Sequence, residues 1–157
     1  MGLMTALEES AFANWAAMTT WVYPWVNSLH ATGMGFLVGI VFVISLRVLG
    51  LGSYLIAPLK RFLVVVRIAF VVNLISGFIL FSIDADRFFS SPTFRVKFLC
   101  LALGIVTGLA LARSIFPRGA EVAAGFVPPP RAKVLAALAI VFWSGAILAG
   151  RLTAYLP

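Results

Sequence analysis

Four long apolar stretches constrain this chain more than any other feature of its sequence. They cover residues 24–46, 62–83, 95–115 and 133–153, and a helix needs about 20 residues to cross a hydrocarbon core. In lipid, only helices and closed barrels pair all of their backbone polar groups internally. We therefore expect an all-α integral membrane protein in which one membrane domain, residues 1–157, forms a four-helix bundle.

The composition agrees with that expectation. Of the 157 residues, 62% are hydrophobic and 11% are charged, whereas soluble domains carry about 25% charged residues. The mean hydropathy is +1.09. The net charge of +7 does not indicate a nucleic-acid partner, because the basic residues stand at the edges of the apolar stretches and form no separate basic surface. The expected partner is the lipid bilayer.

The segment before the first span, residues 3–20, has an amphipathic pattern. Two glutamates lie away from a stripe of apolar residues at helical spacing. That stripe consists of Leu3, Leu7, Ala11, Trp15, Met18 and Val22. The pattern predicts an interfacial helix on the membrane surface that leads into the first span.

Charge predicts the orientation of the spans. The first and third connections with their flanks carry eight basic residues and one acidic residue, Glu121. The opposite side carries four of each sign. Basic residues accumulate in cytoplasmic loops, so we expect a multi-pass protein of the bacterial inner membrane with both termini in the periplasm. The eight basic residues are Arg47, Lys60, Arg61, Arg67, Arg113, Arg118, Arg131 and Lys133.

Ionisable residues inside spans are costly and therefore raise a functional question. At 1.5 Å of rise per residue, His30, the only histidine, lies about 9 Å below the outer start of the first span. The sequence predicts an outer polar layer at this depth. Its members are Asn27, His30, Asp84, Lys97, Cys100 and Arg151.

Several interpretations fit this layer. His30 could be an axial ligand of haem b, with Lys97 and Arg151 neutralising the propionates. His30, Met34 and Cys100 are donors of the kind that suit Cu(I). The imidazole could instead relay protons or contact a substrate. The structural alternative is a hydrogen bond from His30 to a neighbouring helix, with Lys97 and Arg151 reaching the headgroups or the nearby aspartates.

Small residues recur inside the spans and predict close helix contacts. Gly35 and Gly39, Gly104 and Gly108, and Ala146 and Gly150 each stand four residues apart. Such faces pack on one another within a bundle or on a second copy of the chain. Near the middle of the second span, Asn73, Ser76 and Gly77 are expected to join helices and not to bind a ligand.

Five short motifs in this order resemble an uncharacterised bacterial family of four-helix inner-membrane proteins. A histidine followed by glycine three residues later, and a phenylalanine followed by lysine, are also distantly similar to copper-resistance and cytochrome b561-like membrane domains. That resemblance implies His30 as a haem or copper ligand and Lys97 as its charged companion. The motifs are His30 with Gly33, Ser45–Gly50, Ser76–Phe81, Pro92–Lys97 and Ala149–Tyr155.

These patterns favour a small membrane protein that binds haem b in electron transfer or serves as the membrane subunit of a redox complex. One alternative is a cofactor-free assembly protein that forms homo-oligomers or joins a larger complex through its glycine faces. Another is a copper-binding protein or a small transporter. No nucleophile stands beside a base in the sequence, so we do not expect the isolated chain to be an enzyme.

Overall fold

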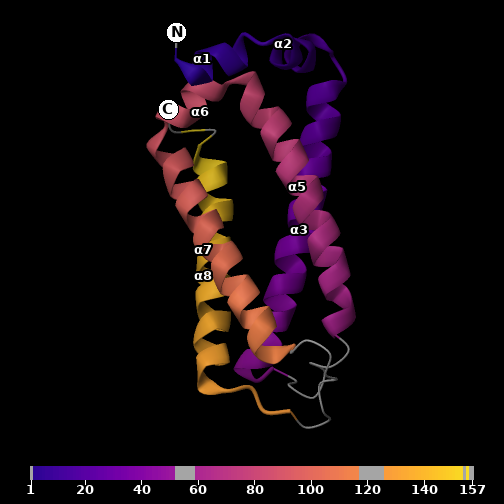
Figure 1. The fold of residues 1–157 in the computed structure, drawn as a ribbon, viewed down its shortest axis with the longest axis vertical. Coiled ribbons are helices and arrows are strands. Elements are labelled where there is room, and N and C mark those ends of the chain that lie inside the picture. The colour runs from indigo at the N-terminus through magenta and orange to yellow at the C-terminus, as the bar shows by residue number, and fades with distance from the viewer. Residues whose placement is uncertain (1, 52–58, 117–125, 154, 156–157) are drawn as a thin grey trace.

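The computed structural model describes residues 2–51, 59–116, 126–153 and 155, and their regular elements are all helical. Four long helices run side by side and three short helices lie at one end (Figure 1). The long helices are α3 (Val22–Leu49), α5 (Leu63–Ile83), α7 (Pro92–Ile115) and α8 (Pro130–Leu152). A short 3-10 turn, η2 (Lys60–Phe62), leads into α5.

All four long helices, with η2 counted as part of the second, are long and apolar enough to cross a membrane. The predicted all-α four-helix membrane fold is therefore confirmed, and lipid surrounds the bundle.

Pro92 and Pro130 begin α7 and α8, because the first helical residue needs no N–H. Gly50, with φ of 120°, ends α3 in a conformation that side chains disfavour. Arg118 and Glu121, in the third connection, lie outside the described residues.

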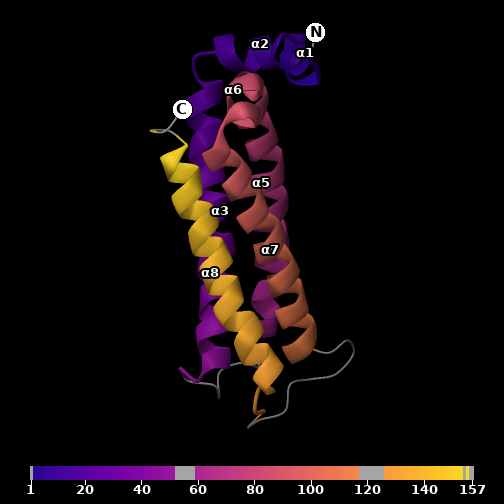
Figure 2. The same ribbon diagram turned by 90° about the vertical axis from the view of Figure 1, so that its left-hand side faces the viewer.

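The bundle consists of two antiparallel pairs, α3 with α5 and α7 with α8, joined by contacts between α3 and α8 (Figure 2). Two clusters of buried side chains form the core where the two helix pairs meet. On α8, alanines recur along the buried face and let neighbouring backbones approach. The buried residues of α8 are Ala132, Ala136, Ala139, Trp143, Ala146 and Ala149.

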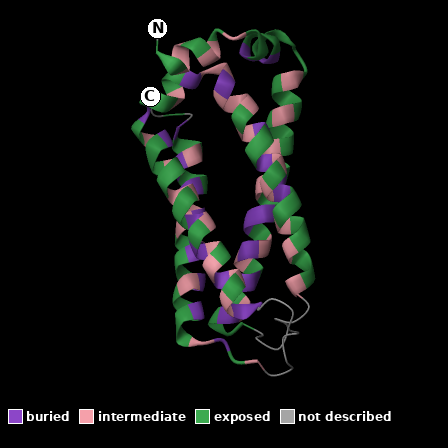
Figure 3. Ribbon diagram, in the orientation of Figure 1, coloured by how far each residue is buried: buried purple, intermediate pink, exposed green. Residues whose placement is uncertain are grey.

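Purple, buried segments follow the inner faces of the long helices, and green, exposed segments follow their outer faces (Figure 3). The exposed outer faces carry many large apolar side chains, such as Ile68, Leu74 and Val106. Such surfaces are expected where acyl chains replace water as the solvent.

The predicted interfacial segment forms two helices, α1 (Leu3–Glu8) and α2 (Ala11–Met18), instead of one. The break follows Glu9, and Ser10 begins the second helix as its N-cap by accepting a hydrogen bond from the Ala13 amide at 3.2 Å. Ala13 and Ala16 are buried, where α2 packs on α5 and α3. The large apolar residues of α2, Phe12, Trp15 and Met18, are exposed, as a membrane-facing surface requires.

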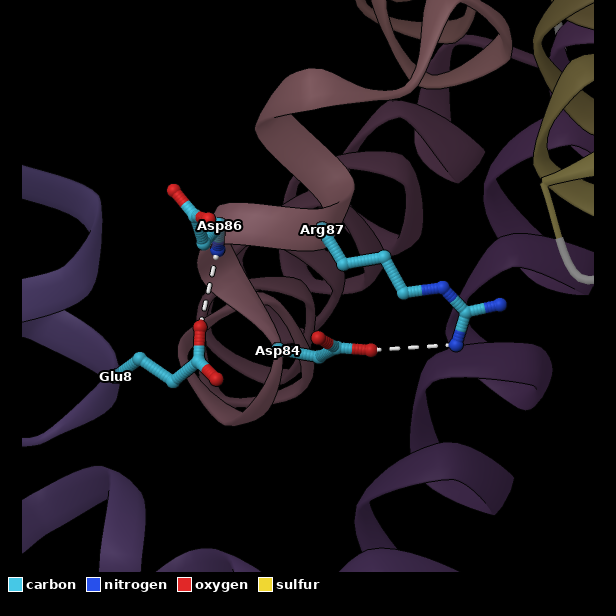
Figure 4. A network of polar contacts seen from close by, with 4 residues as sticks. All are labelled: Glu8, Asp84, Asp86 and Arg87. Atoms are coloured by element: carbon cyan, nitrogen blue, oxygen red, sulfur yellow. Dashed lines mark hydrogen bonds and ion pairs between the residues drawn. The ribbon is translucent and has the colours of Figure 1, made fainter. Parts of the chain in front are cut away.

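A third short helix, α6 (Ala85–Ser90), connects α5 with α7 and contacts α1. We call this end of the bundle, covered by α1, α2 and α6, the roofed end. Glu8 links α1 to α6, because its Oε2 accepts a hydrogen bond from the Asp86 amide at 3.1 Å. Arg87 of α6 pairs with Asp84, the residue before the helix, at 3.3 Å (Figure 4). The sequence patterns did not predict α6.

Candidate functional site

His30 lies on α3 in the roofed half of the bundle and faces α5. Its ring is half-buried, and its Nδ1 lies 2.9 Å from Ser76 Oγ. Ser76 is buried, with 1% of its surface exposed. The two residues are 46 positions apart in the chain, so only the pairing of α3 with α5 brings them together.

The hydrogen bonds of Ser76 decide which nitrogen of His30 carries the proton. Ser76 Oγ lies 2.6 Å from the Val72 carbonyl oxygen, and a carbonyl can only accept. The single hydroxyl proton therefore belongs to that bond, and His30 Nδ1 donates to Ser76 Oγ. In the neutral ring this leaves a lone pair on Nε2. The hydrogen bond to Ser76 is made by Nδ1 and does not occupy Nε2.

Two glycines create the space for this contact. A Cβ placed on Gly77 would lie 3.1 Å from His30 Cε1, and one on Gly33 would lie 2.5 Å from Asn73 Nδ2. Asn73 donates from Nδ2 to the Ala69 carbonyl at 3.0 Å. The Asn73 side-chain oxygen is buried without a described partner. Ser76 and Gly77 contact His30 of α3 and so agree with the prediction that they join helices, whereas the Asn73 hydrogen bond stays within α5 and Asn73 meets α3 by packing at Gly33.

Lys97 lies on the other helix pair, also in the roofed half. Its Cε would be 3.4 Å from a Cβ on Gly150 of α8, and its Nζ lies 5.4 Å from the centre of the Phe94 ring. This arrangement is a cation–π contact. No carboxylate among the described residues pairs with Lys97.

A stack of phenylalanines supports the ring beneath Lys97. Phe94 stacks on Phe81 of α5 with centroids 5.5 Å apart and on Phe88 of α6 at 5.3 Å. Offset ring pairs of this kind are favourable beyond the area they bury. The stack therefore fixes the start of α7, and with it the position of Lys97, against the α5–α6 corner.

The remaining members of the predicted layer occupy different places. Cys100 faces α8, where its Sγ would lie 3.0 Å from a Cβ on Gly145. Met34 packs against the core cluster that contains Trp143. Arg151 and Asn27 are exposed. His30 and Lys97 thus lie in the same half of the bundle but have different neighbours, α5 for His30 and α8 for Lys97. The described residues hold no group of three or more His, Cys, Asp or Glu side chains that could bind a metal.

Some residues of the site carried a signal in the sequence and others carried none. Ser76 and Gly77 were recognised as polar and small residues in a span, but their pairing with His30 was not. Gly145 and the phenylalanine stack were missed, because an aromatic or small residue in an apolar span has many possible neighbours. The histidine was found because an imidazole in a span is unusual.

The fold and the polar groups within it define a small multi-pass membrane protein with a half-buried histidine and a half-buried lysine in one half of its bundle. Comparison of the chain with models of protein families, with curated proteins and with solved structures gave no match.

Proposed function

We propose that this protein binds a b-type haem through His30 Nε2 and acts in electron transfer or as the membrane subunit of a redox complex. The observation that carries the proposal is the hydrogen bond from His30 Nδ1 to Ser76 Oγ. Ligating histidines typically donate their second nitrogen to a neighbouring acceptor, which fixes the tautomer and the ring orientation. Ser76 provides that acceptor, and Nε2 keeps its lone pair.

The donor set of this chain fits a haem with one protein ligand from His30. When bound, the iron would accept and release single electrons. Lys97, which pairs with no carboxylate among the described residues, offers a positive charge for a propionate, and Arg151 at the end of α8 offers a second. The sequence has one histidine, so any second axial ligand would come from another residue type or another subunit.

The proposed setting is the bacterial inner membrane, with the roofed end and both chain ends in the periplasm. The support is the charge difference between the two ends of the bundle, read with the tendency of basic residues to remain cytoplasmic. The cofactor would then lie in the periplasmic half of the bilayer.

An absorption spectrum of the full-length protein, purified in detergent from cells supplied with haem, tests the cofactor. A Soret band is expected, and it should disappear in His30→Ala. Asn27→Ala is the matched control, because Asn27 lies one turn away on the same helix and is exposed. A colourless wild-type preparation that contains no metal would overturn the haem proposal and the copper alternative together.

A second candidate is an assembly protein that associates with copies of itself. A Cβ on Gly35 or on Gly39 would meet no atom within 4 Å, so this glycine face of α3 is not used inside the protomer. By contrast, a Cβ on Gly104 would lie 3.2 Å from Trp143, so that glycine is used within the bundle. Open glycine pairs of this spacing are typical of helix association in lipid.

Native mass spectrometry tests the second candidate. If the face joins two copies, the wild type should be a dimer or larger, and Gly35→Leu with Gly39→Leu should shift it to the monomer. A strict monomer in the wild type, or an oligomer that both substitutions leave unchanged, would contradict this candidate.

A further inference from the structure

The end of the bundle opposite the roof is strongly basic. We call it the basic end; here α3 and α7 end and α5 and α8 begin (Figure 1). No acidic residue of the described chain lies at this end, because Glu8, Glu9, Asp84 and Asp86 all belong to the roofed end. The described basic residues here are Arg47, Lys60, Arg61, Arg67, Arg113, Arg131 and Lys133.

Three of these cations lie where α7 ends and where α8 begins. Arg113 lies in the last turn of α7, and Arg131 and Lys133 lie in the first turn of α8. Between them, Ile115 and Ala132 are fully buried in one core cluster. That buried contact holds the three cations on a fixed part of the fold.

The three side chains are exposed and have no ion pair or hydrogen bond with any described residue. Arg47 on the neighbouring helix differs, because its Nη1 donates to the Leu51 carbonyl at 2.7 Å. No group among the described residues therefore neutralises the cations at the α7–α8 end.

An apolar surface adjoins the cations on the same two helices. On α7, Val106 and Leu109 are 62% and 52% exposed, and on α8, Val134 and Val141 are 59% and 61% exposed. These residues lie on membrane-spanning segments, where their neighbours are acyl chains. A cationic group followed by an apolar surface matches a molecule with an anionic head and hydrocarbon tails.

We propose that the α7–α8 end binds anionic phospholipids, whose headgroups are attracted by Arg113, Arg131 and Lys133 and whose acyl chains lie along the exposed apolar residues of α7 and α8. Basic residues beside a membrane span attract anionic lipid headgroups. The adjoining apolar surface favours a lipid over a free anion, since a free phosphate would gain nothing from it. This site is independent of the haem proposed at the opposite end.

The test is native mass spectrometry of the full-length protein in detergent, titrated with phosphatidylglycerol or with the zwitterionic phosphatidylcholine. Arg113→Gln, Arg131→Gln and Lys133→Gln are combined in one variant. The matched control combines Arg87→Gln, Arg95→Gln and Arg151→Gln, which remove the same charge from the roofed end. Circular dichroism and thermal unfolding establish that both variants fold.

The wild type is expected to bind phosphatidylglycerol in preference to phosphatidylcholine and to lose affinity as salt increases. Removal of one cation should weaken binding roughly fivefold, so the triple variant should bind on the order of 100-fold more weakly. The control variant should bind like the wild type. Equal binding of the two lipids by the wild type, or equal loss in both variants, would overturn the proposal.

Two further measurements keep the proposal testable if the triple variant does not fold. Arg113→Lys with Arg131→Lys retains the charge and should retain the preference for phosphatidylglycerol. Inorganic phosphate is titrated against the lipid complex of the wild type. Displacement of the lipid by phosphate at an equal concentration would show a site for free anions and would overturn the lipid proposal.

Discussion

His30 donates its Nδ1 proton to Ser76 Oγ across the contact between α3 and α5, at 2.9 Å. Gly77, the next residue on α5, leaves the space that the imidazole ring occupies. This pair is the most direct link between the packing of the bundle and its candidate chemistry, because the same contact joins two helices and selects the tautomer of the ring.

The energy of that contact can be measured with a double-mutant cycle. We expect His30→Ala and Ser76→Ala to be coupled by about 0.6 kcal/mol and by no more than roughly 1.7 kcal/mol, the range found for hydrogen bonds between membrane helices. Reversible unfolding in mixed micelles supplies the four free energies of unfolding. Additive single substitutions would show that the hydrogen bond contributes nothing to stability.

Gly33 and Gly35 provide a test of helix packing on a single helix. We expect Gly33→Ala to lower the free energy of unfolding by about 1–3 kcal/mol, because its Cβ would overlap the Asn73 amide, 2.5 Å away. Gly35→Ala is the control, since its Cβ would meet no atom within 4 Å. Equal effects of the two substitutions on thermal unfolding would contradict the close packing of α3 on α5 at Gly33.

Glu8 should stabilise the roof through its hydrogen bond to the Asp86 amide. Glu8→Ala leaves that amide without its side-chain acceptor, so we expect a loss of about 0.5–1 kcal/mol at the start of α6. Hydrogen exchange should become faster in α1 and α6. Glu9→Ala is the control, because the Glu9 side chain has no described partner. Unchanged exchange in Glu8→Ala would show that α1 is held by apolar packing alone.

The proposed orientation predicts which positions a membrane-impermeant thiol reagent can reach. In a Cys100→Ser background, Thr20→Cys at the roofed end should be labelled from the periplasmic side of intact cells. Lys133→Cys at the basic end and Arg118→Cys should be labelled only after the membrane is permeabilised. The reverse result would place both termini in the cytoplasm.

Sequence patterns alone were enough to predict the class of fold and that His30 and Lys97 share one half of the bundle. The number of long apolar stretches predicts the number of spans, because a backbone in lipid must pair its own polar groups and therefore crosses as a helix. The constant rise of a helix fixes depth, and His30 and Lys97 do lie in the same half of the bundle. The local break at Ser10 escaped the apolar periodicity, since a capping residue interrupts a helix without altering that pattern.

The direction in which each residue faces, by contrast, emerged only from the packing of the helices. The rotation of a helix about its axis depends on which small residues leave space for which large side chains of another helix. These partners are distant in the chain. Gly77 admits His30, Gly145 admits Cys100 and Gly150 admits Lys97. A Cβ on Gly35 or Gly39 would contact none of the described side chains, although these two glycines have the same spacing as Gly104 and Gly108, of which Gly104 packs against Trp143. Equivalent patterns in the sequence thus have different neighbours, because contact energies between helices, and not the periodicity of one helix, set the rotation.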